Sequence, residues 1–116
     1  LIAKGADVHA KSNRGLTSLH HAAFNGREKI AEMLVAKNAD VNARSEDGAT
    51  SLHSSVFNNH KKTTELLIAQ GANINAKTVS GAIKGKTPLD LAKDETADLL
   101  RKHGAKTSEE LKAEEK

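Results

Sequence analysis

The chain has 116 residues, a net charge of +3 and 37% hydrophobic residues, with no Cys, Trp or Tyr. This length is typical of one domain, and a core of small aliphatic side chains favours packed helices over a barrel or a sandwich. Without Cys the chain can form no disulfide or Cys-ligated zinc site, which is consistent with the reducing cytoplasm, the compartment that we expect. No run of about 18 apolar residues is present, so we expect no membrane partner.

An internal repeat of 33 residues dominates the sequence. TSLHHAAFNG begins at Thr17, and TSLHSSVFNN begins at Thr50. The same interval separates LIAKGADVHA at Leu1, LVAKNADVNA at Leu34 and LIAQGANINA at Leu67. Self-similarity at a fixed period is typical of solenoids and other repeat arrays.

Each unit is predicted to contain two short helices followed by an extended loop. Thr17 is a candidate N-cap, and Leu19 and Ala23 follow it at a helical i, i+4 spacing. The second helix of this unit is expected to bury Met33 and Leu34. Helices of this length are marginal alone in water, so we expect them to bury their apolar faces against neighbouring units.

These residues resemble a known family. GLTSLHHAAFNGREKIAEMLVAKNADVNA resembles an ankyrin repeat, whose usual pattern runs G-x-T-P-L-H-x-A-A and later L-L-x-x-G-A-D-x-N-A, and the resemblance extends from Leu1 to Lys106. It implies an all-α solenoid of stacked helix-turn-helix units joined by β-hairpin-like loops, with a role in binding rather than catalysis. The division that we expect is a partial repeat over 1–11, full repeats over 12–44 and 45–77, a C-terminal capping repeat over 78–106 and a charged tail over 107–116.

The later units depart from the family pattern. Ser55 and Thr63 replace small or aliphatic core residues, so the second full unit is expected to be the weakest. The last unit carries four extra residues, AIKG, which place Thr87 37 residues after Thr50. Its shortened helical pair is expected to act as a cap with a polar outer face, and the tail that follows is expected to be helical, with Thr107 or Ser108 as its N-cap.

The histidines have two possible roles. His20 and His53 lie three residues after Thr17 and Thr50, and Asp90 takes the equivalent place in the last unit. Pairs with this spacing resemble capping boxes, in which the second side chain turns back to the first residue of the helix. The alternative is a metal site, but equivalent residues on stacked helices lie roughly 8–10 Å apart, too far to share one zinc ion. We expect structural histidines and no metal.

The sequence contains no convincing catalytic motif. GAIKGKT at Gly81 resembles the end of a P-loop, but Gly81 and Gly85 enclose three residues rather than four and no buried strand precedes them. Ser18 and Ser51 lie near histidines in the sequence, yet hydroxyls in the first turn of a helix usually cap it or face solvent. We predict no enzymatic activity and no cofactor.

Phe24 and Phe57 are the only aromatic residues of the chain. On a helical wheel each falls near 140° from the buried leucine of its helix, off the apolar stripe. Each ring either lies over a neighbouring unit or faces the concave groove, and the resemblance implies the groove. Two exposed aromatic side chains one repeat apart suit an interface with a protein partner.

The loops carry a surplus of positive charge. Lys11, Arg14, Arg44, Lys77, Lys84 and Lys86 lie in or beside the turns, against Glu46 and Asp47. A solvated surface is one interpretation, and a protein partner with an acidic patch is the other. Nucleic acid is disfavoured because only two aromatic side chains are available for stacking and acidic residues interleave. The predicted partner-binding residues are Asn13, Arg14, Leu16, His21, Phe24, Asn25, Arg44, Glu46, Asp47, Ala49, Phe57, Asn58 and Lys77.

The N-terminal unit begins within its second helix, because Leu1 and Ile2 match the end of that helix in later units. We expect a fragment of a longer array, in which the stripe of Leu19, Ala22 and Ile30 is left uncovered. We expect weak self-association through this end as a consequence. A purely structural spacer within a longer repeat protein is the alternative function.

Overall fold

The computed structural model describes residues 8–115, in which seven helices and no strand are present. The helices are α1 (Ser18–Phe24), α2 (Glu28–Ala36), α3 (Ser51–Phe57), α4 (Lys61–Ala69), α5 (Pro88–Leu91), α6 (Asp94–Lys102) and α7 (Ser108–Glu114). The predicted all-α solenoid is confirmed. The first seven residues of the predicted partial repeat lie outside the described residues.

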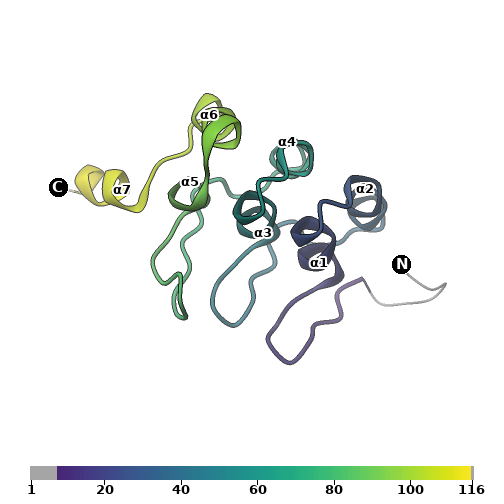
Figure 1. The fold of residues 1–116 in the computed structure, drawn as a ribbon. Coiled ribbons are helices and arrows are strands. Elements are labelled where there is room, and N and C mark those ends of the chain that lie inside the picture. Colours follow the sequence, from purple (N-terminus) through teal and green to yellow (C-terminus); the bar gives the residue numbers. More distant parts are fainter. Residues whose placement is uncertain (1–7, 116) are drawn as a thin grey trace.

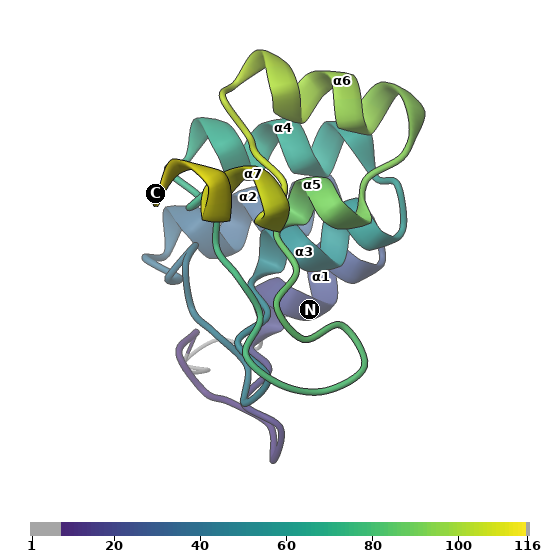
Figure 2. The same ribbon diagram turned by 90° about the vertical axis from the view of Figure 1, so that its left-hand side faces the viewer.

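The first six helices form two layers (Figure 1). The inner layer consists of α1, α3 and α5, which lie beside the long loops, and the outer layer consists of α2, α4 and α6. Each inner helix packs against the outer helix of its own unit and against the inner helix of at least one neighbouring unit. Figure 2, turned by 90°, shows the same stacking order. This arrangement leaves the loops and one face of the inner layer open.

One leucine recurs at the centre of each layer. Leu19 and Leu52 in the inner layer, and Leu34, Leu67 and Leu100 in the outer layer, are each 0% exposed. Burying such a side chain contributes about 1.5–3 kcal/mol. Packing between units, rather than helix propensity, therefore stabilises these short helices.

Every inner helix begins with a capping box. The hydroxyls of Thr17, Thr50 and Thr87 accept a hydrogen bond from the backbone N–H three residues later, and the side chain of that residue accepts one from the backbone N–H of the threonine. Thr107 begins α7 in the same way with Glu110. The predicted caps are confirmed, and they fix where each helix starts.

The outer helix α2 corrects one prediction. Ala31 and Leu34 are 0% exposed, whereas Met33 is 48% exposed. The buried face is centred between Ala31 and Leu34, and Met33 lies about 100° away from Leu34 on the helical wheel. The expectation that Met33 belongs to the core is therefore wrong.

Ser55 and Thr64, two buried polar residues of the second full unit, are hydrogen-bonded to each other, whereas the buried hydroxyl of Ser51 in the same unit has no partner among the described residues. Ser55 and Thr63 are 0% and 2% exposed. The hydroxyl of Ser55 lies 2.8 Å from the hydroxyl of Thr64 and 3.2 Å from the carbonyl oxygen of Leu52. Thr64 also donates to the carbonyl oxygen of His60 at 2.8 Å. Because the hydroxyl of Ser55 has partners, its burial alone does not mark this unit as weak.

The four extra residues of the last unit enlarge its loop. Residues 78–86, here the insertion loop, are closed by a hydrogen bond from the N–H of Thr78 to the carbonyl oxygen of Lys86 at 3.1 Å. The N–H of Gly85 donates to the carbonyl oxygen of Thr78 at 2.9 Å, and the hydroxyl of Thr78 donates to that of Ile83. Thr78 is buried, so the hydrogen bonds that fix the conformation of the loop are shielded from solvent at this residue.

The exposed side of α6 is polar, as the sequence predicts. The exposed residues on and beside α6 are Lys93, Asp94, Glu95, Asp98, Arg101 and Lys102. The tail is helical as predicted, and α7 is attached to the array by hydrogen bonds. The guanidinium group of Arg101 lies 2.7 Å from the carboxylate of Glu110, and the N–H of Ser108 donates to the carboxylate of Asp90 at 3.0 Å.

The N-terminal end is better covered than the sequence predicted. Leu19 and Ala22 are 0% and 5% exposed, and only Ile30 is half-buried. The expectation of an uncovered stripe is therefore wrong for Leu19 and Ala22, because α1 packs against both α2 and α3. A cleft of about 390 Å³ remains at this end, lined by Ser18, His21, Ala22, Asn25, Arg27, Ile30 and Leu34.

Candidate functional site

The two repeated histidines are fully engaged in structural hydrogen bonds. The N–H of Thr17 donates to Nδ1 of His20 at 3.0 Å, and Nε2 of the same ring lies 2.9 Å from the carbonyl oxygen of Ala49. Since Nδ1 accepts, Nε2 must carry the proton and donate to Ala49. The ring therefore joins the start of α1 to the loop of the next unit.

His53 repeats this arrangement one unit later. Its Nδ1 accepts from the N–H of Thr50 at 3.1 Å, and its Nε2 lies 3.0 Å from the carbonyl oxygen of Lys86. Burial lowers the pKa of both His20 and His53, and the hydrogen bonds to the carbonyl oxygens only partly offset that effect. With both ring nitrogens occupied, neither side chain is available as a general base or a metal ligand. Within residues 8–115 no group of three His, Asp or Glu side chains could hold a metal ion.

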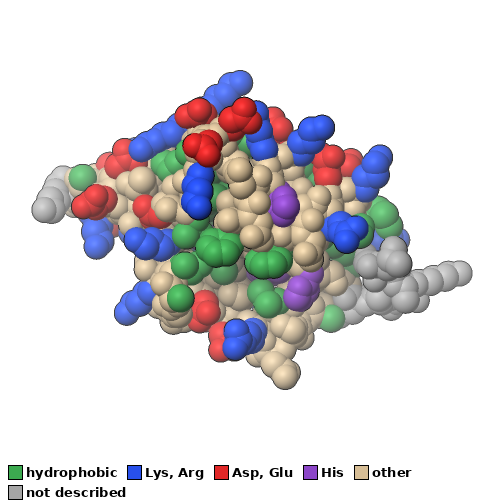
Figure 3. Space-filling model, viewed as in Figure 1, with side chains coloured by type: hydrophobic (Ala, Val, Ile, Leu, Met, Phe, Trp, Pro, Cys, Tyr) green, Lys and Arg blue, Asp and Glu red, His purple; other side chains and the backbone are tan. Residues whose placement is uncertain are grey.

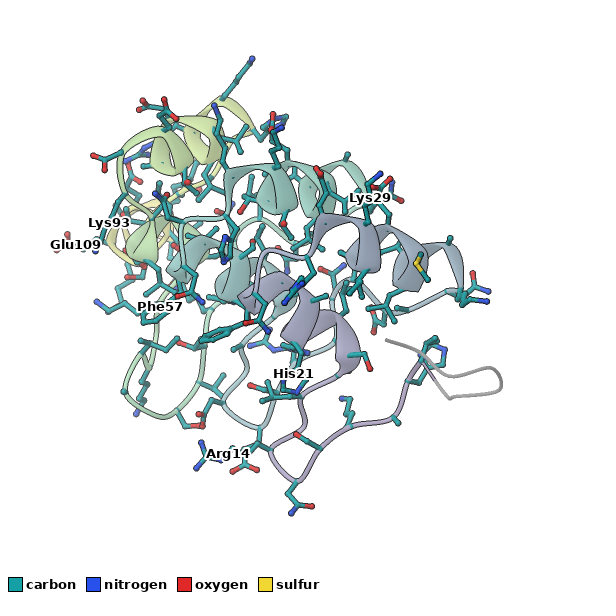
Figure 4. All side chains as sticks on the ribbon, turned by 45° about the vertical axis from the view of Figure 1, so that its right-hand side comes forward. Arg14, His21, Lys29, Phe57, Lys93 and Glu109 are labelled. Carbon is teal, nitrogen blue, oxygen red and sulfur yellow. The ribbon has the colours of Figure 1, made fainter. Side chains whose placement is uncertain are left out.

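The phenylalanines lie off the buried face, as the helical wheel predicts. Phe24, the last residue of α1, is 49% exposed, and Phe57, the last residue of α3, is 57% exposed. Figure 3 shows hydrophobic side chains gathered in the middle of one face, with histidines and basic side chains around them. Figure 4 shows Phe57 on this open side of the inner layer, above the loops.

A shallow apolar groove connects the two rings. It has a volume of about 190 Å³ and is lined by Phe24, Ala49, His53, Ser54, Phe57 and Ile83. We refer to it as the phenylalanine groove. Two inner helices and the insertion loop contribute to its walls, so it crosses the boundaries between units.

Sequence analysis missed Ile83 as a member of this site. The available signal was the four-residue insertion AIKG, which interrupts the 33-residue period and contains Ile83. The period alone gives no equivalent position in the earlier units, so only the structure places this side chain beside Phe57.

The other predicted partner-binding residues lie around the phenylalanine groove and along the loops. The exposed ones are Asn13, Arg14, His21, Asn25, Arg44 and Glu46, and the partly buried ones are Leu16, Asp47, Ala49, Asn58 and Lys77. Figure 4 places Arg14 on the first loop and His21 on α1, on the same side of the molecule as Phe57. Their partner-binding role stays a prediction.

Several of these side chains hold neighbouring units together. The guanidinium group of Arg44 donates to the carbonyl oxygen of Lys77, and the amide of Asn58 donates to that of Phe24 at 2.9 Å. The carboxylate of Asp47 accepts from the hydroxyl of Ser80 at 2.7 Å. These contacts give the three residues a structural task in addition to any role at the surface.

The repeat is also apparent in comparison with known proteins. The family described as "Ankyrin repeats (3 copies)" matches residues 1–78, more than half of the chain. The chain belongs to the ankyrin repeat family. Ankyrin repeats are generally protein–protein interaction modules and are generally not catalytic. A search of curated proteins finds no match.

The described helices were also compared with the requirements for a membrane-spanning segment. No helix within residues 8–115 has the length and apolar content that crossing a bilayer requires. The exposed apolar side chains are instead concentrated at a few positions, namely Phe24, Met33, Phe57 and Val79. Two of these four line the phenylalanine groove.

Proposed function

We propose that this chain is a non-catalytic module that binds a protein partner through the phenylalanine groove and the adjoining loop tips. The observation that carries the proposal is the exposure of Phe24 and Phe57 at equivalent positions of successive units. Aromatic side chains are enriched among the residues that dominate binding energies at interfaces. Their cost of exposure in the free chain is recovered when a partner covers them.

Contacts between units support rigid presentation of this surface. The N–H of Glu46 donates to the carbonyl oxygen of Arg14 at 2.8 Å, and the N–H of Val79 donates to that of Asp47 at 2.8 Å. Each loop tip is thus attached to the next. A surface that is already ordered loses little conformational entropy when it binds, so more of the contact energy appears as affinity.

The charge of the loops favours a partner with an acidic patch. Arg14, Lys84 and Lys86 are exposed, and within residues 8–115 no hydrogen bond occupies their side-chain nitrogens. Long-range attraction of this kind mainly raises the association rate and weakens as salt is added. A nucleic acid partner is less consistent with the surface, since Glu46 interrupts the basic loops and only two aromatic rings are available for stacking.

We propose further that the chain is divided into units at the predicted boundaries 12–44, 45–77 and 78–106, with 107–116 as a helical tail. In this division each unit contributes one inner helix and one outer helix. A purely structural spacer is the alternative function, and weak self-association through the cleft beside α1 is a secondary proposal. Neither alternative gives the exposed phenylalanines a role.

Affinity capture followed by titration tests the proposal. The full chain, a Phe24→Ala/Phe57→Ala variant and a Met33→Ala variant are each immobilised and exposed to the same lysate, and captured proteins are identified by mass spectrometry. Met33 is the matched control, because it is 48% exposed on the outer layer. A protein retained by the full chain and the Met33 variant is then purified and titrated by calorimetry.

The expected result is that loss of the two rings weakens binding by at least tenfold, roughly the effect of one strong interface residue. Loss of Met33 leaves the affinity unchanged. Equal binding by all three proteins would contradict a site at the groove, and the absence of any reproducible partner would favour the spacer.

A further inference from the structure

The insertion loop forms one wall of the phenylalanine groove through the side chain of Ile83. Ile83 is half-buried and lines the groove together with Phe24 and Phe57. Its carbonyl oxygen accepts from the hydroxyl of Thr78 and from the N–H of Lys86, the latter at 3.3 Å. The backbone beside this side chain is therefore fixed from two directions.

The floor of the groove is tied to the same loop. His53 lines the groove and donates from Nε2 to the carbonyl oxygen of Lys86 at 3.0 Å, while its Nδ1 accepts from the N–H of Thr50. The hydroxyl of Ser54 donates to the carbonyl oxygen of Thr50 at 3.5 Å. Since the polar groups of the lining already have partners, a polar ligand group in the groove would lose its hydration without a strong replacement. An apolar side chain suits the groove better.

The size of the groove agrees with one such side chain. Its volume of about 190 Å³ corresponds to about six water molecules at roughly 30 Å³ each. A single leucine, methionine or phenylalanine side chain is small enough to enter this space and would displace several of these water molecules. It would contact the two exposed rings and Ile83 at once.

The loop beside the groove carries only positive charge. From Lys77 to Lys86, both included, the chain has three lysines and no acidic residue, and Lys84 and Lys86 are exposed. The neighbouring loop contributes the acidic residues Glu46 and Asp47, and the carboxylate of Asp47 accepts a hydrogen bond from Ser80, so the three lysines exceed the nearby acidic residues by one. A bound segment passing over the insertion loop therefore meets a surplus of cations.

We infer that the insertion loop makes the phenylalanine groove selective for a peptide segment of the partner that carries one bulky apolar side chain with acidic residues beside it. The apolar side chain fills the groove between Phe24, Phe57 and Ile83, and the acidic residues lie against Lys84 and Lys86. This inference rests on the proposed function, because it assumes that the groove binds a protein.

Peptide display provides a test that does not require the natural partner. A random 12-residue peptide library is selected against the full chain, and the enriched sequences are synthesised with a fluorescent label. The expected consensus is one Leu, Met or Phe next to two or more Asp or Glu. Selection of basic or wholly polar peptides would contradict the inference.

Matched variants then locate the binding site by anisotropy titration of the selected peptide. Ile83→Ser is expected to weaken binding by at least tenfold, whereas Val79→Ser, which changes an exposed apolar residue of the same loop outside the groove, leaves it unchanged. Lys84→Glu/Lys86→Glu is expected to weaken binding and to flatten its salt dependence. Circular dichroism and the midpoint of thermal unfolding verify that each variant is folded.

The outcomes separate this inference from the proposed function. If Phe24→Ala/Phe57→Ala abolishes binding but Ile83→Ser and the charge reversals do not, the groove binds proteins and the role of the insertion loop is wrong. If binding survives the loss of both rings, the proposed function fails as well.

Discussion

Nε2 of His53 lies 3.0 Å from the carbonyl oxygen of Lys86, the residue directly before the capping threonine of the next inner helix. His20 has the same relationship to Ala49, at 2.9 Å. Only the neutral ring can make this bond while its Nδ1 accepts from a threonine N–H, because a protonated imidazole has no acceptor. Each neutral histidine thus connects a helix start to the following unit.

This arrangement predicts that acid weakens the array near neutral pH. Burial lowers the pKa of His20 and His53 below the ordinary value of 6.5, so the unfolded chain takes up protons first as the pH falls. Their contribution to the free energy of unfolding is complete above pH 6.5 and is lost as the pH falls from there through the lowered pKa values. Urea denaturation at pH 8, 7, 6 and 5 measures the decline.

The control compares two sets of variants. His20→Asn/His53→Asn should be less stable at pH 8 but should lose less stability between pH 7 and pH 5 than the parent chain. His103→Gln removes an exposed histidine that is not among the groups lowering the pKa of His20 or His53, and it should leave the pH profile unchanged. An identical decline in all three proteins would show that other groups cause it.

Removal of a capping hydroxyl should destabilise the array locally. Thr17→Val keeps the side-chain volume but removes the acceptor for the N–H of His20, and we expect it to cost about 1 kcal/mol of unfolding free energy. Ser18→Ala, which changes the exposed neighbour, is the control and should cost much less. If the two substitutions have equal effects in denaturant titrations, the capping box contributes nothing to stability.

The hydrogen bond between the buried hydroxyls of Ser55 and Thr64 should stabilise the second full unit. Because the two hydroxyls lie 2.8 Å apart, Ser55→Ala should lower the unfolding free energy by about 0.5–1.5 kcal/mol rather than raise it. Thr64→Val should have a similar cost. The double variant Ser55→Ala/Thr64→Val should lose less unfolding free energy than the sum of the two single losses. Each single variant leaves one buried hydroxyl without its partner, whereas the double variant removes both hydroxyls. Strict additivity in a double-mutant cycle would exclude coupling between them.

Gly26 is required for both its backbone conformation and its contact with the next unit. Its φ is +66°, and a Cβ there would lie 2.6 Å from Nδ1 of His60, whose Nε2 lies 3.0 Å from the carbonyl oxygen of Phe24. Gly26→Ala should therefore displace His60 in addition to the roughly 1–2 kcal/mol cost of a left-handed residue. Gly104→Ala, at φ +87° with no atom within 4 Å of the new Cβ, has only the backbone cost. Equal losses of unfolding free energy would show that the His60 contact is unimportant.

Sequence periodicity was sufficient for much of the fold. The threonine caps and the exposure of Phe24 and Phe57 follow from spacing, because helix geometry and the 33-residue period determine which side chains face the neighbouring unit. The prediction that Met33 is buried was wrong. The helical spacing of Ile30, Met33 and Leu34 is compatible with a buried face on either side of Leu34, and the spacing alone does not decide between them. A nearby alanine, Ala31, occupies the place assigned to Met33.

The contacts between units could not be predicted in the same way. Nothing in the spacing indicates that Ser55 lies beside Thr64, since this pairing depends on the crossing of α3 and α4. The position of Ile83 depends on the path of the insertion loop, which has no counterpart in the earlier repeats. The cover over Leu19 and Ala22 likewise comes from the packing of α1 against α2 and α3.

Backbone amide chemical shifts of the ¹⁵N-labelled full chain, recorded during titration with the identified partner or the selected peptide, test the central claim most directly. We expect the largest changes at the end of α1, at the end of α3 and in the insertion loop, with Phe24, Phe57 and Ile83 among the residues affected. Amides on the exposed side of α2, including that of Met33, should change little. Shift changes centred on the outer layer of α2, α4 and α6, with the phenylalanine groove unaffected, would contradict the account.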